Sequence, residues 1–162
     1  MLEHTIPENS FDKVYLALKY LVEASEERQK DFHFDILSLQ CDISNKQFFK
    51  EFCTVRLCSA RSSGHSSAIY KLIQNKFEKV VLIYSNISIK NHSESIIREY
   101  NIENKICSVI LNNGKFFPIS KEVEAIIVDG SWCLSKKDIE DIYILGERYF
   151  DKTKPFYFIF VQ

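Results

Sequence analysis

The stretch CTVRLCSARSSGHSS, residues 53–67, decides the expected fold of this chain. Its first part, through Cys58, is mostly apolar or β-branched, a composition that is typical of a strand. The serine-rich residues that follow predict a loop, and apolar residues then recur at helical spacing over 64–76. The stretch therefore predicts a strand that passes through a short loop into a helix.

The rest of the chain repeats this alternation of strand and helix. Apolar runs that predict buried strands occupy residues 79–84, 106–111, 124–129 and 155–161. Helical spacing fills two of the intervals, where Ser93 and Ser135 are the expected N-caps and Gly146 lies near a helix end. Alternating strands and helices over 53–161 predict an α/β fold with a doubly wound, mostly parallel sheet.

One connection departs from this alternation. The residues Asn112, Asn113 and Gly114 stand between two apolar runs, and Asn-Gly in this setting is a strong signal for a tight turn. We therefore expect a small β-hairpin near residues 106–119.

The N-terminal part of the chain predicts helices. Apolar and aromatic residues recur at helical spacing over 11–27, and we assign the aromatic stripe of this amphipathic helix to core packing. The pattern over 31–43 fits a short helix or a strand and does not decide between them. Ser44 or Asn45 then begins a brief helix that runs through Phe52.

Length and composition fit one domain. A chain of 162 residues, 46% of them hydrophobic, is long enough to bury one core and too short for two comfortable domains. We therefore expect a single domain, 1–162, in which a helical lead-in over 1–52 packs on an α/β core over 53–162. The formal net charge of −1 gives the chain no overall attraction to nucleic acid or to anionic membranes.

Cysteine and histidine usage favours an intracellular protein without a dedicated zinc site. The five cysteines are odd in number and form no C-x-x-C pair, so we expect free thiols in a reducing cytoplasm. The four histidines are scattered singly. Residues 1–10 lack the features of a secretory signal, and the apolar runs are too short to span a membrane. We expect a cytoplasmic location, which for a viral protein means the host cytoplasm.

The loop over 59–67 has the position of a phosphate-binding loop. A loop between a buried strand and a helix presents backbone N–H groups and the positive end of the helix dipole to one point. In the pattern G-x-x-x-x-G-K-[ST], Gly64 and Ser66 match, whereas Ser59 replaces the first glycine and His65 the lysine. Asp129 ends another buried strand, and the carboxyl ends of strands are where such sheets bind ligands.

With these residues, the chain over about 53–161 resembles a degenerate P-loop NTPase that has a RecA-like or helicase-like core and a histidine in place of the Walker A lysine. The resemblance implies ATP as the nucleotide and Mg²⁺ as its companion ion, with Ser66 and Asp129 at the metal. Arg61 would serve as a substitute cation. The expected phosphate-binding residues are Ser59, Arg61, Ser63, Gly64, His65, Ser66 and Ser67.

Two departures from the family pattern predict weak or absent hydrolysis. His65 is shorter than lysine and mostly neutral near pH 7. Gly130 follows Asp129, where many ATPases of the class have a glutamate. We therefore predict an ATP-binding protein with little or no turnover, and we assign no catalytic residue.

The same departures favour an alternative function, a catalytically silent P-loop-like interaction module. Such a pseudo-NTPase would be an accessory subunit or a small viral factor that acts on a replication or host complex. The expected partners are therefore a nucleotide and a protein, and nucleic acid would be reached only through a complex.

Overall fold

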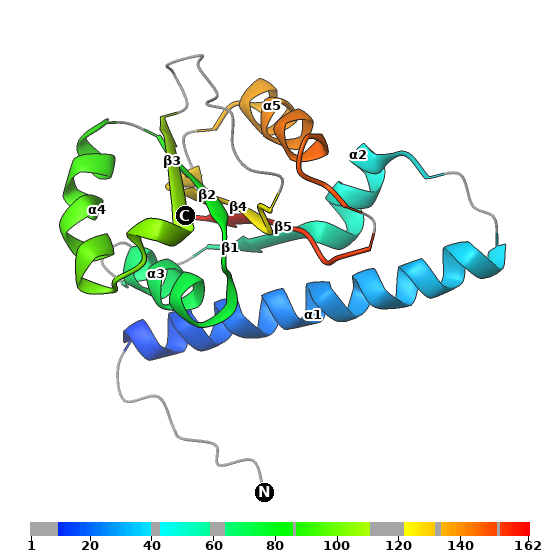
Figure 1. Cartoon of the computed structure of the whole chain (residues 1–162), viewed down its shortest axis with the longest axis horizontal. Coiled ribbons are helices and arrows are strands. Elements are labelled where there is room, and N and C mark those ends of the chain that lie inside the picture. The colour runs from blue at the N-terminus through cyan, green and yellow to red at the C-terminus, as the bar shows by residue number, and fades with distance from the viewer. Residues whose placement is uncertain are drawn as a thin grey trace, which may run out of the picture.

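The computed structural model describes residues 10–39, 43–58, 64–85, 87–110, 122–131, 134–151 and 153–162. Its centre is a five-stranded, all-parallel sheet with the strand order β1-β5-β4-β2-β3 (Figure 1). The strands are β1 (Thr54–Leu57), β2 (Val80–Tyr84), β3 (Ile106–Ile110), β4 (Ala125–Asp129) and β5 (Tyr157–Val161). The helices are α1 (Ser10–Leu39), α2 (Asn45–Phe48), the π-helical turn η1 (Phe49–Cys53), α3 (His65–Lys76), α4 (Ile87–Glu99), the 3-10 turn η2 (Glu103–Lys105) and α5 (Lys136–Glu147). The predicted doubly wound α/β fold is confirmed.

Helices cover both faces of the sheet (Figure 1). On one face, side chains of α1, α3 and α4 pack against strand residues such as Leu82 and Ile127. On the other face, α5, α2 and η1 pack against Ile83 and Val128, which follow Leu82 and Ile127 in their strands. Strands β2, β4 and β5 are buried along their whole length, which is why the sequence shows them as unbroken apolar runs.

Helix α1 is longer than the helix predicted over 11–27. It continues to Leu39, so the part of 31–43 that the structure describes up to that residue is helical. The early turns of α1 pack against α3, where Leu18 is fully buried. Farther along, the Phe32 ring contacts Phe48 and Phe52, with centroid separations of 5.0 and 4.1 Å. The contacts of Phe32 explain why the helix continues beyond residue 27, because packing against apolar partners stabilises a helix.

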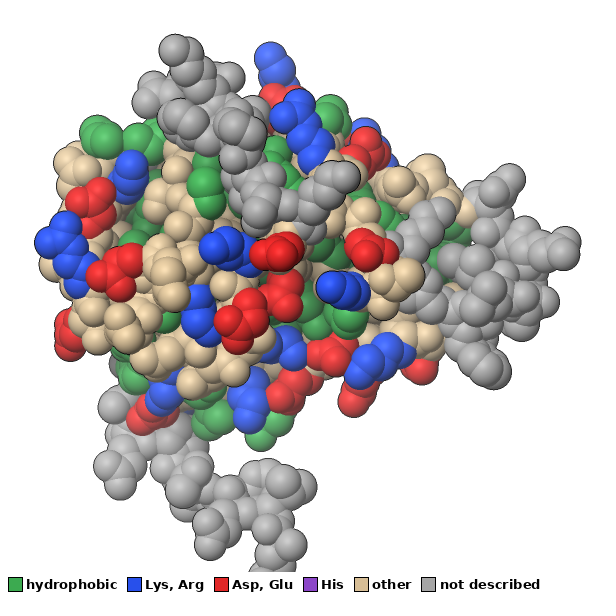
Figure 2. Space-filling model, in the orientation of Figure 1, with side chains coloured by type: hydrophobic (Ala, Val, Ile, Leu, Met, Phe, Trp, Pro, Cys, Tyr) green, Lys and Arg blue, Asp and Glu red, His purple; other side chains and the backbone are tan. Residues whose placement is uncertain are grey.

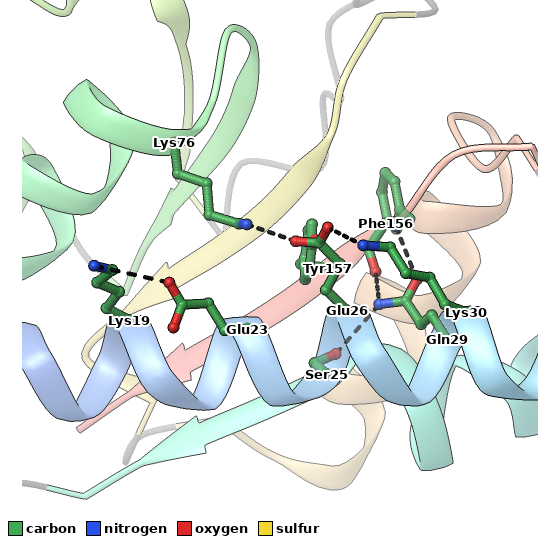
Figure 3. Close-up of polar contacts among 9 residues, drawn as sticks. All are labelled: Lys19, Glu23, Ser25, Glu26, Gln29, Lys30, Lys76, Phe156 and Tyr157. Carbon is green, nitrogen blue, oxygen red and sulfur yellow. Dashed lines mark hydrogen bonds and ion pairs between the residues drawn. The ribbon is translucent and has the colours of Figure 1, made fainter. Parts of the chain in front are cut away.

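A polar network fastens α1 to the start of β5 (Figure 3). The buried Gln29 amide donates to the Phe156 carbonyl and accepts from the Phe156 N–H, both at 3.0 Å. Beside it, Glu26 pairs with Lys30 at 2.8 Å and with Lys76 at 2.7 Å. The hydrogen bonds from Lys30 and Lys76 lower the pKa of Glu26 to about 2. This network holds the part of α1 around Glu26 and Gln29 at the amino edge of the sheet, the edge opposite the predicted phosphate loop.

The expected N-caps have different outcomes. Ser135 caps α5, as predicted. Ser93 is no cap, because α4 begins at Ile87 and Ser93 lies buried within it. Its Oγ donates to the Ile89 carbonyl at 2.8 Å, a bond to the carbonyl four residues earlier that a serine inside a helix can make. Serine favours caps by propensity, and here this local hydrogen bond and burial against the sheet override that preference.

Two other predictions concern glycine and the hairpin. Gly146 lies within the last turn of α5, where a Cβ would stand 2.1 Å from the Phe158 ring, so it allows close approach of helix and sheet. Strand β3 forms the edge of the sheet and runs parallel to β2. The turn and second strand of the hairpin expected over 106–119 fall on residues 111–121, outside the described residues.

The surface carries charges of both signs. Lys/Arg and Asp/Glu side chains are interspersed over the face that Figure 2 shows, in keeping with the net charge of −1. Three of the cysteines, Cys53, Cys58 and Cys107, are free thiols, as predicted. Within the described ranges, none of the helices has both the length and the apolar character needed to cross a membrane.

Candidate functional site

The N-terminus of α3 lies at the carboxyl edge of the sheet. Gly64 is its N-cap residue, with φ 80° and ψ 24°, and no side chain bonds to the first turn as a cap. A Cβ at this position would lie 3.3 Å from the Phe11 Cβ, and the positive φ is one that residues with a side chain rarely adopt. Glycine thus permits both the turn and its contact with α1. Because the cap residue is glycine, its side chain provides no acceptor for the first N–H groups of α3.

His65, the first residue of α3, contacts the aspartate at the end of β4. Its Nε2 lies 3.4 Å from Asp129 Oδ1, an ion-pair contact slightly longer than an ordinary hydrogen bond. The Asp129 side chain is only 2% exposed, whereas that of His65 is 26% exposed. The hydrogen-bonding interaction with Asp129 raises the pKa of His65 above its ordinary value, and burial of the imidazole opposes this shift.

Two buried atoms of this pair have no hydrogen-bond partner in the described part of the chain: Nδ1 of His65 and Oδ2 of Asp129. A buried polar atom without a partner is costly, and such atoms in a folded protein commonly meet water or a ligand. Because Nε2–H faces the carboxylate, Nδ1 accepts in the neutral ring and donates only when the ring is protonated, and Oδ2 accepts when ionised.

Polar side chains from two other elements surround the pair. Tyr84, the last residue of β2, is the register partner of Asp129, so both side chains lie on the same face of the sheet. Burial raises the pKa of both Tyr70 and Tyr84, and neither hydroxyl has a hydrogen-bond partner in the described part of the chain. His65, Tyr70, Tyr84, Ser93 and Asp129 thus form a polar cluster on this face of the sheet.

The predicted site residues have three outcomes. Gly64, His65 and Asp129 come together at the carboxyl edge. Ser66 and Ser67 lie in the first turn of α3, where the Ser67 side chain bonds to Tyr100 and no hydrogen bond or ion pair of the described chain joins Ser66 to Asp129. The other predicted residues, Ser59, Arg61 and Ser63, lie outside the described residues.

The contact between His65 and Asp129 is the feature that the sequence did not predict. The two residues are far apart in the chain, and they meet because α3 begins where β1 ends and β4 ends at the same edge of one parallel sheet. The sequence indicated part of this arrangement, because the start of α3 and the end of β4 were both expected at the carboxyl edge of the sheet. Nothing in the sequence gave the direction of the imidazole.

The described residues fit a hydrated magnesium ion poorly. Mg²⁺ requires octahedral oxygen ligands at about 2.0–2.1 Å and usually retains several waters. One oxygen of Asp129 faces the imidazole of His65, and the other is buried. No group of three or more His, Cys, Asp or Glu side chains that suits a metal occurs among the residues the structure describes. The expected magnesium site at Ser66 and Asp129 remains a prediction.

A cavity lies at the other edge of the sheet. It has a volume of about 670 Å³ and lies at the amino edge, lined by residues such as Phe77, Val123 and Phe156. Lysines and acidic residues are mixed around it, including Lys105, whose ammonium bonds to the Phe77 carbonyl. A mixed-charge groove of this kind indicates no particular ligand, and the chemistry of interest remains at the opposite edge.

No protein-family model, curated protein or solved structure matches this chain. The interpretation of its function therefore depends on the geometry at the carboxyl edge.

Proposed function

We propose that the chain binds the phosphate groups of a nucleotide, with ATP as the first candidate, at the N-terminus of α3, and that it hydrolyses the nucleotide slowly or not at all. The observation that carries the proposal is the N-terminus of α3 at Gly64, which no side chain of the described residues caps, beside the polar atoms of His65 and Asp129 that have no partner among those residues.

Three properties of this edge support phosphate binding. The α3 dipole places partial positive charge at His65, and the N–H groups of the first turn, which no side chain of the described residues caps, are suited to phosphate oxygens. Gly64 supplies the left-handed backbone conformation from which the helix begins. Nδ1 of His65 has no partner among the described residues and becomes a further donor when the ring is protonated. These features belong to the carboxyl edge, where doubly wound sheets bind ligands.

Slow turnover follows from how the charged groups are arranged. In the family that the sequence resembles, a lysine reaches the terminal phosphates, whereas here the imidazole of His65 is directed at Asp129. Gly130 follows Asp129 with φ 82°, and its N–H donates to the Val161 carbonyl at 3.0 Å. The position after Asp129 therefore supplies no carboxylate for activation of water.

Calorimetric titration of the full chain with ATP and with ADP tests the proposal. We expect binding by the wild type and a loss of about tenfold or more in affinity in Gly64→Val, because a β-branched side chain strains the turn that positions the first N–H groups of α3. The matched control is Ser135→Ala at the N-terminus of α5, which should bind as the wild type does. Absence of binding at millimolar nucleotide would reject the function.

The second candidate, a silent interaction module in a replication or host complex, is favoured by a different observation. Neighbouring residues Tyr20 and Leu21 on α1 are 56% and 37% exposed, although both are large and apolar. Paired apolar side chains at the surface are a feature of protein interfaces. A complex with one defined protein that Tyr20→Lys disrupts, in a chain that binds no nucleotide, would favour this function over the first.

A further inference from the structure

We infer that the outer edge of β1 and a basic groove beside it bind an extended acidic segment of a partner protein, which adds to the sheet as a strand next to β1. The inference goes beyond nucleotide binding, because it concerns the lateral edge of the sheet and uses no atom of the α3 N-terminus.

Strand β1 has one side of its backbone available for pairing. It is the first strand in the sheet order, so β5 is the one strand beside it in the described part of the chain. The Leu57 carbonyl accepts from the Gln162 N–H at 3.0 Å, which directs the backbone groups of Leu57 toward β5. Because this direction alternates along a strand, the N–H and C=O groups of Arg56 point to the outer edge. Arg56 is exposed, and an edge of this kind is a template for a further strand.

A groove with a volume of about 490 Å³ lies along β1, on the side of the sheet that α5 covers. The residues that line it come from η1, β1 and α5, and they are Lys50, Thr54, Arg56, Lys136, Ile139, Glu140 and Tyr143. The Thr54 hydroxyl donates to the Phe49 carbonyl at 2.7 Å, so the Tyr143 hydroxyl, 2.9 Å away, donates to Thr54. Both hydroxyl protons are used within the protein, and polar contacts to a ligand therefore fall to the charged side chains.

The groove has an excess of positive charge. Its cations are Lys50, Arg56 and Lys136, and Glu140, its one carboxylate among the described residues, already pairs with Lys50 at 2.8 Å. Within the same residues, Arg56 and Lys136 form no ion pair. The Arg56 guanidinium lies 5.6 Å from the centre of the Phe160 ring, a cation–π contact that orients it over the sheet. Two cations thus remain for an anionic partner, and the guanidinium suits a carboxylate.

Charge and backbone together select the occupant. A second copy of this chain would bring the same cations against Arg56 and Lys50, and like charges opposed across a strand pair are destabilising. A nucleic acid meets the cations but lacks the peptide N–H and C=O groups that pair with a strand edge. An extended segment with acidic residues at alternate positions meets both requirements, because its main chain pairs with β1 while its carboxylates, on one face, reach Arg56 and Lys136.

Fluorescence anisotropy of the full chain with labelled peptides tests the inference. The probe is a peptide of about eight residues that alternates valine and glutamate, and the comparison peptide alternates valine and lysine. We expect saturable binding of the acidic peptide alone, and a loss of about tenfold or more in affinity in Arg56→Glu. The matched control is Arg98→Glu, at an exposed position of α4, which should bind as the wild type does.

Two results overturn the inference at this stage: absence of acidic-peptide binding at millimolar concentration, and equal binding by the wild type and Arg56→Glu. If Arg56→Glu is unfolded by circular dichroism, Lys136→Glu replaces it, because Lys136 is exposed in the first turn of α5, where a carboxylate suits the helix dipole.

Selective N-methylation of the peptide separates strand addition from charge attraction. Methylation of the glutamate amides removes the N–H donors along one edge of the peptide, and methylation of the valine amides removes those along the other edge. We expect one methylated peptide to bind as the parent does and the other to lose about tenfold or more in affinity. Equal affinities of the two would show that the β1 backbone takes no part. Single-stranded DNA that binds more tightly than the acidic peptide, and loses affinity in Arg56→Glu, would overturn the choice of a peptide partner.

Discussion

Helices α3 and α5 both begin beyond the carboxyl ends of parallel strands, yet their first turns are completed in opposite ways. At α5, the Ser135 Oγ accepts from the Asp138 N–H at 3.2 Å, and the Asp138 carboxylate accepts from the Ser135 N–H at 2.7 Å. At α3, Gly64 has no side chain with which to cap. One helix satisfies N–H groups through its own capping residues, whereas no side chain of the described residues caps the other. Proximity to the carboxyl edge therefore does not make a binding site, whereas an uncapped first turn beside unpartnered buried atoms is a candidate for one.

The largest effect is expected from closing the open N-terminus with Gly64→Val. A β-branched residue at φ 80° is strained, and its side chain meets Phe11, so we expect a loss of about 2–3 kcal/mol in the free energy of unfolding. Urea denaturation measures this loss. Gly64→Asn is the control, because asparagine tolerates the left-handed region and should cost less than about 1 kcal/mol. Equal stability of Gly64→Val and the wild type would show that the turn does not require glycine.

A smaller effect is expected from opening the closed N-terminus with Ser135→Ala. Loss of a serine cap costs typically about 1 kcal/mol, and the Asp138 carboxylate also loses its hydrogen bond from the Ser135 hydroxyl, while the bond from the backbone N–H of residue 135 remains. Denaturant unfolding should show this loss, while phosphate affinity at α3 stays unchanged. An increase in phosphate binding by the variant would mean that any uncapped N-terminus at this edge suffices, and the contrast between the two helices would then carry no functional meaning.

The acid sensitivity of the α5 cap sharpens the same contrast. Hydrogen bonds from the Ser135 side chain and backbone lower the pKa of Asp138. The sign follows: the contribution of this carboxylate to stability is present above its unfolded-state pKa and is lost as the pH falls through the folded-state pKa. Acid titration followed by circular dichroism should show a weaker pH dependence in Asp138→Asn. The cap at α5 is therefore acid-sensitive, while the contact at α3 responds to the other end of the pH range.

How much of this could be predicted from sequence depends on how local each feature is. The buried strands and the Ser135 cap follow from apolar runs and from residues three positions apart, so they were predictable. The role of Ser93 was not, because it is set by burial of α4 against the sheet. The same distinction applies to the site. Gly64 was predictable because it matches the second glycine of the phosphate-loop pattern. The contact between His65 and Asp129 depends on two strands that end at the same level, and no local pattern encodes that.

The smallest effect concerns the pH dependence of the α3 site. Asp129 raises the pKa of His65 above its ordinary value of 6.5, so the stability that the charged pair contributes is fully present below the unfolded-state pKa and is lost as the pH rises through the folded-state pKa. The effect should be smaller than those above, because the imidazole remains 26% exposed and solvent screens it. Titration of the His65 ring protons by nuclear magnetic resonance should give a lower pKa in Asp129→Asn than in the wild type, with His92 as the internal control. An unchanged pKa of His65 in that variant would mean that the two side chains do not interact in solution, and the difference between α3 and α5 would then reduce to the missing cap alone.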